Sequence, residues 1–244
     1  YMAEANRLGI EIRPPHINHS NRAFTLTQPP TPDPQLPILH MGLGQVRDLR
    51  RRTVRQIIAA REERPFDSLQ DLTRRVSMQV KELRHLVQCG ALDGLGESRA
   101  VHLSEAELAG RAGSTGQLSF NFASAPVVPD TAADRFEWER RILGQPVSVH
   151  PLELPHDLPK TTPLTQLAAL GRRSHRAVTV AGTRLPGWTG GPGFFLGDGR
   201  DFVIIRGDKK LEKPEPWLPL LLCGRWLVDE WGSGWLQVEE MRFL

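Results

Sequence analysis

The sequence predicts a multidomain α + β protein, in which a helical N-terminal part precedes a small five-stranded β-barrel. Between residues 41 and 112 apolar residues recur at spacings of three and four, which is the period of an amphipathic helix. Between residues 171 and 244 they alternate in short runs separated by glycine-rich turns, which is the period of β-strands. The change of period predicts two kinds of domain in one chain.

Composition limits the possible classes of protein. The chain has 244 residues, 39% of them hydrophobic and 24% charged, with a net charge of +3, as is ordinary for a folded protein. No run approaches the roughly 20 apolar residues of a membrane helix. Cys89 and Cys223 are isolated in the sequence, which argues for a reducing compartment. We therefore expect a cytoplasmic protein without membrane contact.

The first 40 residues are predicted to hold the end of a helix, a short extended run at Ile10–Ile12 and a proline-rich crossing. Pro14-Pro15 stops regular structure, and residues 28–37 are predicted to form a loop. Because the sequence opens at Tyr1 as if already inside a helix, it reads as a piece of a longer chain.

Four short helices are predicted between residues 41 and 112. The first begins near Arg51, and its apolar face is Val54, Ile57 and Ile58. The second helix is centred on Leu69–Val76, with Ser68 or Asp67 as its N-cap. The third is centred on Val80–Val87, with Gly90 as its C-terminal cap. The fourth is predicted between Ser98 and Ala112.

Basic residues are concentrated around the first of these helices. From Arg47 to Arg84 there are eleven lysines and arginines against six acidic residues, and such a patch favours nucleic acid as partner. The run Leu43–Arg50 and the following helix resemble a helix-hairpin-helix, which presents N–H groups and a helix N-terminus to DNA phosphates. The predicted DNA contacts are Gln45, Arg47, Arg50, Arg51, Arg52, Thr53 and Arg55.

The hairpin departs from the usual pattern at one place. Where such hairpins usually have glycine, a hydrophobic residue and glycine, this chain has Asp48, Leu49 and Arg50. The missing glycines hinder close backbone approach and Asp48 repels phosphate, so binding is predicted to rest on arginine side chains. The alternative is that these arginines form only a solvated helix face.

Residues 113–170 are predicted to be a linker with one helix, at Asp134–Leu143, which ends at Gly144; residues 151–165 are proline-rich and expected to be extended. A hexapeptide in the linker resembles the peptide that bacterial proteins insert into the sliding-clamp groove, where apolar side chains fill a pocket and a glutamine amide fixes orientation. A local packing strand is the alternative. The predicted clamp contacts are Gln117, Leu118, Phe120 and Phe122.

The last 74 residues are predicted to form five strands with an insertion, Pro214–Leu222, after the third. This is the plan of an OB-fold. The predicted strands are Ala177–Leu185, Gly193–Gly197, Asp201–Arg206, Arg225–Trp231 and Trp235–Leu244.

Aromatic and basic residues interleave along the predicted barrel, as they do in OB-folds that stack bases of single strands beside a cationic groove. Trp188, in a glycine-rich loop, is the predicted stacking residue. Arg184, Arg206 and Lys209 are the predicted phosphate contacts. The alternative is that the aromatic residues fill the barrel, and this is our interpretation of Phe194, Phe202 and Trp226.

No catalytic constellation or cofactor motif is visible, so no metal or other cofactor is predicted. His16, His19 and His40 have no acidic or cysteine partner at metal-ligand spacing, and we interpret them as solvated loop residues. Asp198 and Asp201 flank a Gly-Arg pair and are interpreted as a β-turn.

These motifs follow one another in a recognisable order. Glu4–Ile12 and Pro14–Ser20 look like the end of the fingers region in DnaE-type α subunits of bacterial DNA polymerase III, which are C-family polymerases. The run Leu43–Arg47 is more similar to the error-prone branch of this family than to the main replicase. Four further stretches resemble the family's tandem helix-hairpin-helix: Gly42–Val46, Ile57–Arg61, Pro65–Leu72 and Cys89–Asp93. Two more resemble the segment before its OB-fold: Leu143-Gly144 and Ser148–Leu152.

The resemblance implies four parts: 1–40 as a fingers-like end and proline-rich crossing, 41–112 as a tandem helix-hairpin-helix DNA-binding domain, 113–170 as the linker and 171–244 as the OB-fold. The full enzyme copies DNA, in replication or translesion repair, with acidic residues of a palm. Those residues would lie upstream, so this chain alone is predicted to be non-catalytic. The implied partners are double-stranded DNA, single-stranded DNA, the sliding clamp and the rest of the polymerase.

Two other functions fit the sequence. A free-standing protein with a helix-hairpin-helix and an OB-fold would be a repair accessory or a split polymerase subunit. A scaffold would work through the clamp peptide alone, with the arginines only solvated. A hydrolase or metal enzyme is the most distant possibility, because no nucleophile with a base and no ligand cluster is visible.

Overall fold

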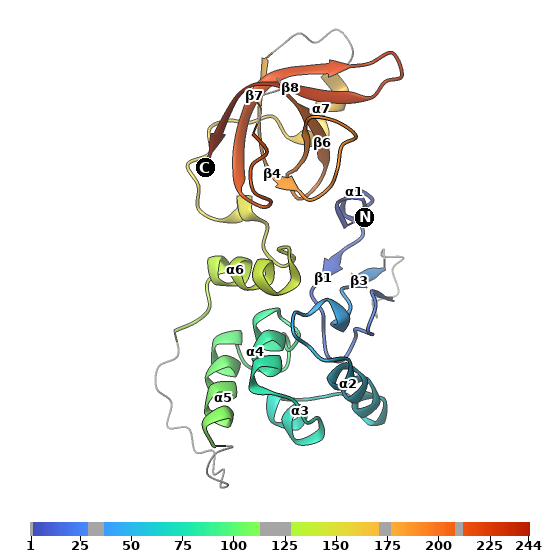
Figure 1. Ribbon diagram of the computed structural model, residues 1–244, viewed down its shortest axis with the longest axis vertical. Coiled ribbons are helices and arrows are strands. Elements are labelled where there is room, and N and C mark those ends of the chain that lie inside the picture. The colour runs from blue at the N-terminus through green and yellow to red at the C-terminus, as the bar shows by residue number, and fades with distance from the viewer. Residues whose placement is uncertain (1, 29–36, 113–127, 171–176, 208–211) are drawn as a thin grey trace. The chain divides into compact units, whose positions relative to one another are not determined.

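The computed structural model describes residues 2–28, 37–112, 128–170, 177–207 and 212–244 (Figure 1). The chain forms two compact units. We call Glu11–Ser148 the helical unit, and Tyr1–Ile10 together with Val149–Leu244 the barrel unit. None of the helices in these ranges combines the length and the apolar character needed to cross a membrane.

The helical unit combines a small sheet with five helices (Figure 1). The sheet has the order β1-β3-β2, with β1 and β3 parallel and β2 and β3 antiparallel. It was not predicted, because strands of two or three residues leave no alternating pattern. The elements are β1 (Ile12–Arg13), β2 (Thr25–Thr27), β3 (Ile38–His40), the 3-10 helix η1 (Leu43–Gln45), α2 (Arg51–Glu63), α3 (Leu69–Arg75), α4 (Val80–Gln88), α5 (Arg99–Ala112) and α6 (Ala132–Leu143).

The predicted helices and their caps are confirmed. The Ser68 hydroxyl accepts a hydrogen bond from the backbone N–H of Asp71 at the start of α3, which satisfies one of the free donors there. Gly90 and Gly144 follow α4 and α6 with φ of +83° and +79°, a conformation that glycine adopts without steric cost. The apolar faces of these helices meet in one core, in which Ile57, Leu72 and Leu86 are fully buried.

The barrel unit contains five strands that close on themselves in the order β4-β5-β6-β8-β7. Neighbours are antiparallel except β6 and β8, which are parallel. This confirms the predicted five-stranded, OB-like barrel. Its elements are α1 (Met2–Arg7), η2 (Pro151–Glu153), α7 (Leu164–Leu167), η3 (Ala168–Leu170), β4 (Ala177–Leu185), β5 (Phe194–Gly197), β6 (Phe202–Arg206), β7 (Pro219–Val228) and β8 (Gly234–Phe243).

Two predicted boundaries in this unit are wrong. The fourth strand begins at Pro219, inside the segment predicted as an insertion, because Leu220 and Leu222 point into the core and are fully buried. Proline is tolerated at the first position of a strand, where it removes no interior ladder bond. Residues 151–165 are not all extended either, since they contain η2 and the start of α7.

The interior of the barrel is aromatic and aliphatic. Phe194 and Trp226 are buried, as predicted. Phe202 is only half-buried and packs edge-on against Phe195, with ring centroids 5.9 Å apart. Asp198 accepts hydrogen bonds from the N–H groups of Arg200 and Asp201, which confirms the predicted turn.

Candidate nucleic-acid interface

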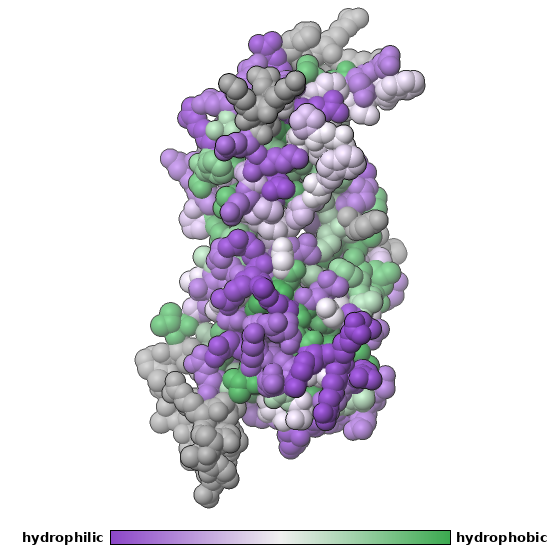
Figure 2. All heavy atoms as spheres, in the orientation of Figure 1, coloured by the Kyte–Doolittle hydropathy of each residue, from purple (hydrophilic) through white to green (hydrophobic). Residues whose placement is uncertain are grey.

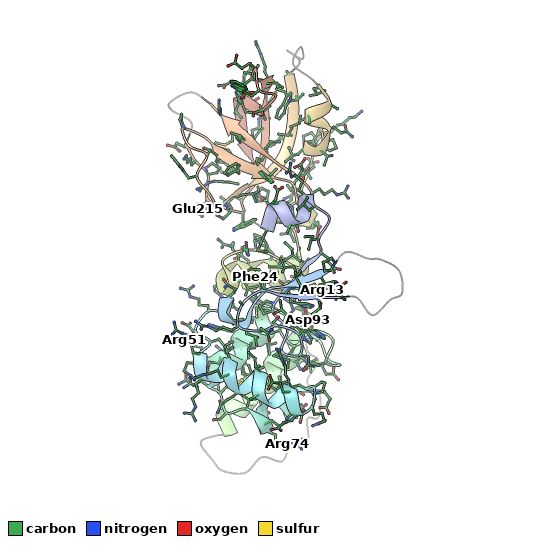
Figure 3. All side chains as sticks on the ribbon, turned by 90° about the vertical axis from the view of Figure 1, so that its right-hand side faces the viewer. Arg13, Phe24, Arg51, Arg74, Asp93 and Glu215 are labelled. Carbon is green, nitrogen blue, oxygen red and sulfur yellow. The ribbon has the colours of Figure 1, made fainter. Side chains whose placement is uncertain are left out.

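Three arginines near the start of α2 are exposed and close together in the sequence. Arg51, Arg52 and Arg55 are exposed, and none has a hydrogen-bond or ion-pair partner for its side chain among the described residues. Arg51 points away from the body of the unit (Figure 3). In Figure 2 strongly hydrophilic side chains gather over the region that α2 occupies in Figure 1. We call these three residues the arginine cluster.

Arg50 and Thr53, two of the predicted DNA contacts, are engaged inside the protein. Glu82 of α4 is 1% exposed and accepts from Arg50 Nε and Nη2 at 3.0 and 2.5 Å. Its other oxygen accepts from the Arg50 backbone N–H at 3.0 Å and from the Thr53 hydroxyl at 2.7 Å. Glu82 therefore occupies the place at the start of α2 where a phosphate was expected. Thr53 is buried, which corrects its assignment as a surface contact.

The environment of Glu82 favours its charged form. Burial alone would raise the pKa of this carboxyl, but hydrogen bonds from Arg50, the Gln79 N–H and Thr53 outweigh burial and lower the pKa from 4.5 to about 2. The carboxylate is therefore ionised at any physiological pH.

Replacing Glu82 by glutamine is expected to lower the free energy of unfolding at pH 7 by about 1.5–3 kcal/mol, since it weakens charge-assisted hydrogen bonds. A carboxyl whose pKa is lowered by folding contributes stability above its ordinary pKa, here 4.5, and loses it as the pH falls toward 2. Urea unfolding should therefore show a difference between the two proteins that shrinks below pH 4.5. A pH-independent difference would contradict this, and Glu63→Gln, an exposed acid of α2, is the control.

The hairpin before α2 keeps its shape without glycine. Asp48 has φ of +62°, a left-handed conformation that aspartate tolerates better than most residues. Its carboxylate lies 2.9 Å from Lys81 Nζ, and the hydrogen bond from Lys81 lowers the pKa of Asp48. The negative charge is therefore matched within the unit, so the repulsion of phosphate that we expected from Asp48 is reduced.

The main chain of Arg47 in this hairpin is hydrogen-bonded to two neighbouring helices. The Arg47 N–H donates to the carbonyl of Ile142 at 3.2 Å, and the Arg47 carbonyl accepts from His85 Nδ1 at 2.7 Å. The Arg47 guanidinium donates to the Arg141 carbonyl at 3.3 Å. Arg47 and Gln45 remain on the surface, but the hairpin N–H of residue 47 is not available to DNA.

A second hairpin, residues 89–98, joins α4 to α5. Gly90, Gly94 and Gly96 all have positive φ there, and a Cβ at Gly94 or Gly96 would meet nothing within 4 Å. Its first part, Cys89–Asp93, resembles the family's tandem helix-hairpin-helix, but no residue of this hairpin is among the predicted DNA contacts. Its glycines, spaced by two and four residues, are the signal that could have marked it.

The three histidines of the N-terminal segment form a cluster. His40 is buried and His16 is half-buried, which corrects their interpretation as solvated loop residues, whereas His19 is exposed in a turn, as expected. The rings of His16 and His19 stack with centroids 4.5 Å apart, and those of His19 and His40 lie 5.3 Å apart. Pairing of Arg13 in β1 with His40 in β3 joins the two segments. No group of three or more His, Cys, Asp or Glu in the described ranges is arranged to hold a metal ion.

Two tryptophans stand out on the barrel unit. Trp188, between β4 and β5, is 78% exposed, and Trp231, between β7 and β8, is 85% exposed. Trp231 was predicted to end a strand, although its neighbours Gly232 and Gly234 resemble the glycine-rich surroundings of Trp188. In OB-folds, loops in these two positions bind oligonucleotides.

The basic residues predicted for the barrel differ in availability. The Arg206 guanidinium lies 4.5 Å from the ring centroid of Trp235 and is exposed. Arg184 Nη1 donates to the Pro214 carbonyl at 2.7 Å, so this arginine has a role within the fold. Lys209 and the clamp peptide, with Gln117, Leu118, Phe120 and Phe122, lie outside the described residues.

Comparison with known proteins agrees with these features. The helix-hairpin-helix motif family matches residues 9–102. An error-prone DNA polymerase of Alkalilimnicola ehrlichii is 39% identical over 101 residues, which are 41% of this chain and 10% of the relative. DNA polymerase III subunit alpha of Helicobacter pylori is 34% identical over 119 residues, 46% of this chain and 10% of the relative. DNA polymerase III subunit alpha of Halalkalibacterium halodurans is 28% identical over 165 residues, which are 62% of this chain and 14% of the relative.

Among solved structures, asparaginyl-tRNA synthetase from Pyrococcus horikoshii, complexed with asparaginyl-adenylate, aligns with 36% of this chain and 23% of its own, at 14% identity and a TM-score of 0.30.

Fold and motif together define a helix-hairpin-helix protein with an OB-like barrel. The chain is homologous to the part of DNA polymerase III α subunits and error-prone DNA polymerases that contains the helix-hairpin-helix, which confirms the resemblance. It spans about a tenth of the length of these relatives.

Proposed function

We propose that the chain is the DNA-binding and partner-docking C-terminal region of a bacterial DNA polymerase III α subunit, acting in replication or translesion repair in the cytoplasm. Relatives of both the replicative and the error-prone kind match, so the proposal covers both branches. The observation that carries it is the arginine cluster within the helix-hairpin-helix region. Charged donors without protein acceptors are what a DNA backbone requires.

The proposed division of labour assigns double-stranded DNA to the helical unit and single-stranded DNA to the barrel unit. The arginine cluster, with Gln45 and Arg47 beside it, contacts phosphates of double-stranded DNA without reading sequence. On the barrel unit, Trp188 stacks on bases of single-stranded DNA and Arg206 contacts the backbone, with Lys209. The hexapeptide from Gln117 docks on the sliding clamp, and catalysis belongs to a palm in the rest of the polymerase.

Replacing Arg51, Arg52 and Arg55 together by alanine should weaken binding to primed duplex DNA. If each arginine neutralises one phosphate, the slope of log K against log salt should fall by up to about 2.7, at about 0.9 per phosphate. Fluorescence anisotropy across a salt series measures this slope. An unchanged slope would show that the cluster is only a solvated face.

A charge-matched control separates specific contacts from loss of net charge. Arg74, Arg84 and Arg140 are also exposed arginines of the helical unit, but each is paired with an acid. Their triple alanine variant has the same net charge as the first one. We expect its salt slope to stay close to that of the unsubstituted chain.

A further inference from the structure

The second hairpin borders a cavity of about 400 Å³ within the helical unit. Its walls come from the β1 segment, the turn after it, β3 and the hairpin. Two of the lining residues, Arg13 from β1 and Asp93 from the hairpin, are labelled in Figure 3. The lining residues that matter here are Arg13, His16, His19, His40, Asp93 and Gly94.

Three residues of this cavity have hydrogen-bond donors without a protein acceptor in the described part of the chain. Only Nε of Arg13 is paired, with Glu11 at 2.7 Å, which leaves both terminal nitrogens. The His19 ring makes no hydrogen bond, and the Gly94 N–H donates to no acceptor. His16 differs, because Asp93 and Asn18 engage both of its ring nitrogens.

The acids around the cavity are each paired with an arginine. Glu11 is paired with Arg13, and Arg99 is paired with both Asp93, at 2.6 Å, and Glu139, at 3.1 Å. Arg61 donates only to neutral oxygens, those of Ile17, Ser20 and Asn21.

Burial and the nearby arginines lower the pKa values of the histidines that line the cavity. Burial lowers the pKa of His19, and the nearby Arg61 and Arg13 lower it further. Burial, with His19 beside each ring, also lowers the pKa of His16, to about 4, and that of His40. An anion in the cavity would oppose all these shifts.

We propose that this cavity binds a phosphate group through Arg13, His19 and the Gly94 N–H. A phosphate has several oxygens that accept hydrogen bonds, so one phosphate can serve donors from different segments that line the same cavity. The inference rests on the proposed function in one respect, because the phosphate is assigned to the DNA backbone. The Gly94 N–H of the second hairpin would then make the main-chain contact with phosphate that the N–H groups of Arg47 and Arg50, which donate to Ile142 and Glu82, do not make.

The test uses the whole chain and two readouts. Arg13→Gln with His19→Gln should weaken duplex binding about tenfold and lower the salt slope by about 1, as expected for one lost phosphate contact. Arg13→Lys should recover part of the affinity, and Arg74→Gln is the control for lost charge. In NMR titrations, the His19 ring proton signals should shift on adding duplex, and the apparent pKa of His19 should rise.

The outcomes are distinct. If the arginine-cluster variant loses DNA binding while the Arg13/His19 variant does not, and His19 does not shift, the cavity proposal fails and the proposed function stands. If the unsubstituted chain binds no DNA, the proposed function fails, and titration with inorganic phosphate and a deoxynucleoside monophosphate decides the cavity. A His19 shift with these small ligands supports a phosphate site served by free nucleotide, and no shift overturns it.

Discussion

Replacing Glu139 by alanine is expected to lower the free energy of unfolding of the helical unit by about 3–5 kcal/mol, the usual cost of breaking a buried ion pair. Glu139 is fully buried in α6 and accepts from Arg99 Nη1 at 3.1 Å. It also accepts from the N–H groups of Val147 and Ser148 at 2.7 and 2.8 Å, and from the Ser148 hydroxyl. Without it, Arg99 keeps only Asp93 as a carboxylate partner.

Urea unfolding followed by far-ultraviolet circular dichroism measures this loss. Glu137 provides the control, because it lies on the same helix but is exposed and paired with the exposed Arg140. Exposed pairs contribute about 0–1 kcal/mol, so Glu137→Ala should change stability little. Equal effects of the two substitutions would mean that the buried network adds nothing to the stability of the fold.

The second large effect is expected on the barrel. Trp188→Ala and Trp231→Ala should each weaken binding of a single-stranded oligothymidylate by about 1–3 kcal/mol, the range found where a base stacks on an aromatic side chain. Tryptophan fluorescence quenching by the oligonucleotide should also fall in each variant. Duplex affinity should not change, because the arginine cluster belongs to the other unit.

Phe243→Ala is the matched control for the tryptophans. Phe243 is 62% exposed at the end of β8, so it tests whether any exposed aromatic residue affects binding. If the three variants bind the oligonucleotide as tightly as the unsubstituted chain, the loops are not a stacking site.

The predictable parts of this protein are those with local signals. The alternation of apolar and polar residues correctly predicted β4 at Ala177–Leu185, and capping residues such as Ser68 and Gly90 correctly predicted the helix ends. The start of β7 was missed because its residues, from Pro219, form a continuous apolar run without alternation.

The candidate site was harder to predict because it depends on partners far apart in the sequence. Arg50 and Thr53 read as free side chains, but Glu82 engages both across about 30 residues. His19 and His40 read as loop residues until the β1–β3 pairing brings their segments together. No local pattern in the sequence predicts either contact.

The closed barrel also restricts how the chain can assemble with others. Within the described residues, each of its five strands has two hydrogen-bonded neighbours. Where both sides of a strand are paired, the sheet offers no template for strand addition, the route by which many peptides dock and many β-proteins aggregate. The closure is short in two places, because β8 pairs with β6 only over Trp235–Gln237 and β4 pairs with β5 only over Thr183–Leu185. Strand addition to the barrel is therefore restricted to Ala177–Gly182 of β4 and Val238–Phe243 of β8, and partners elsewhere on the barrel must recognise its loops and side chains.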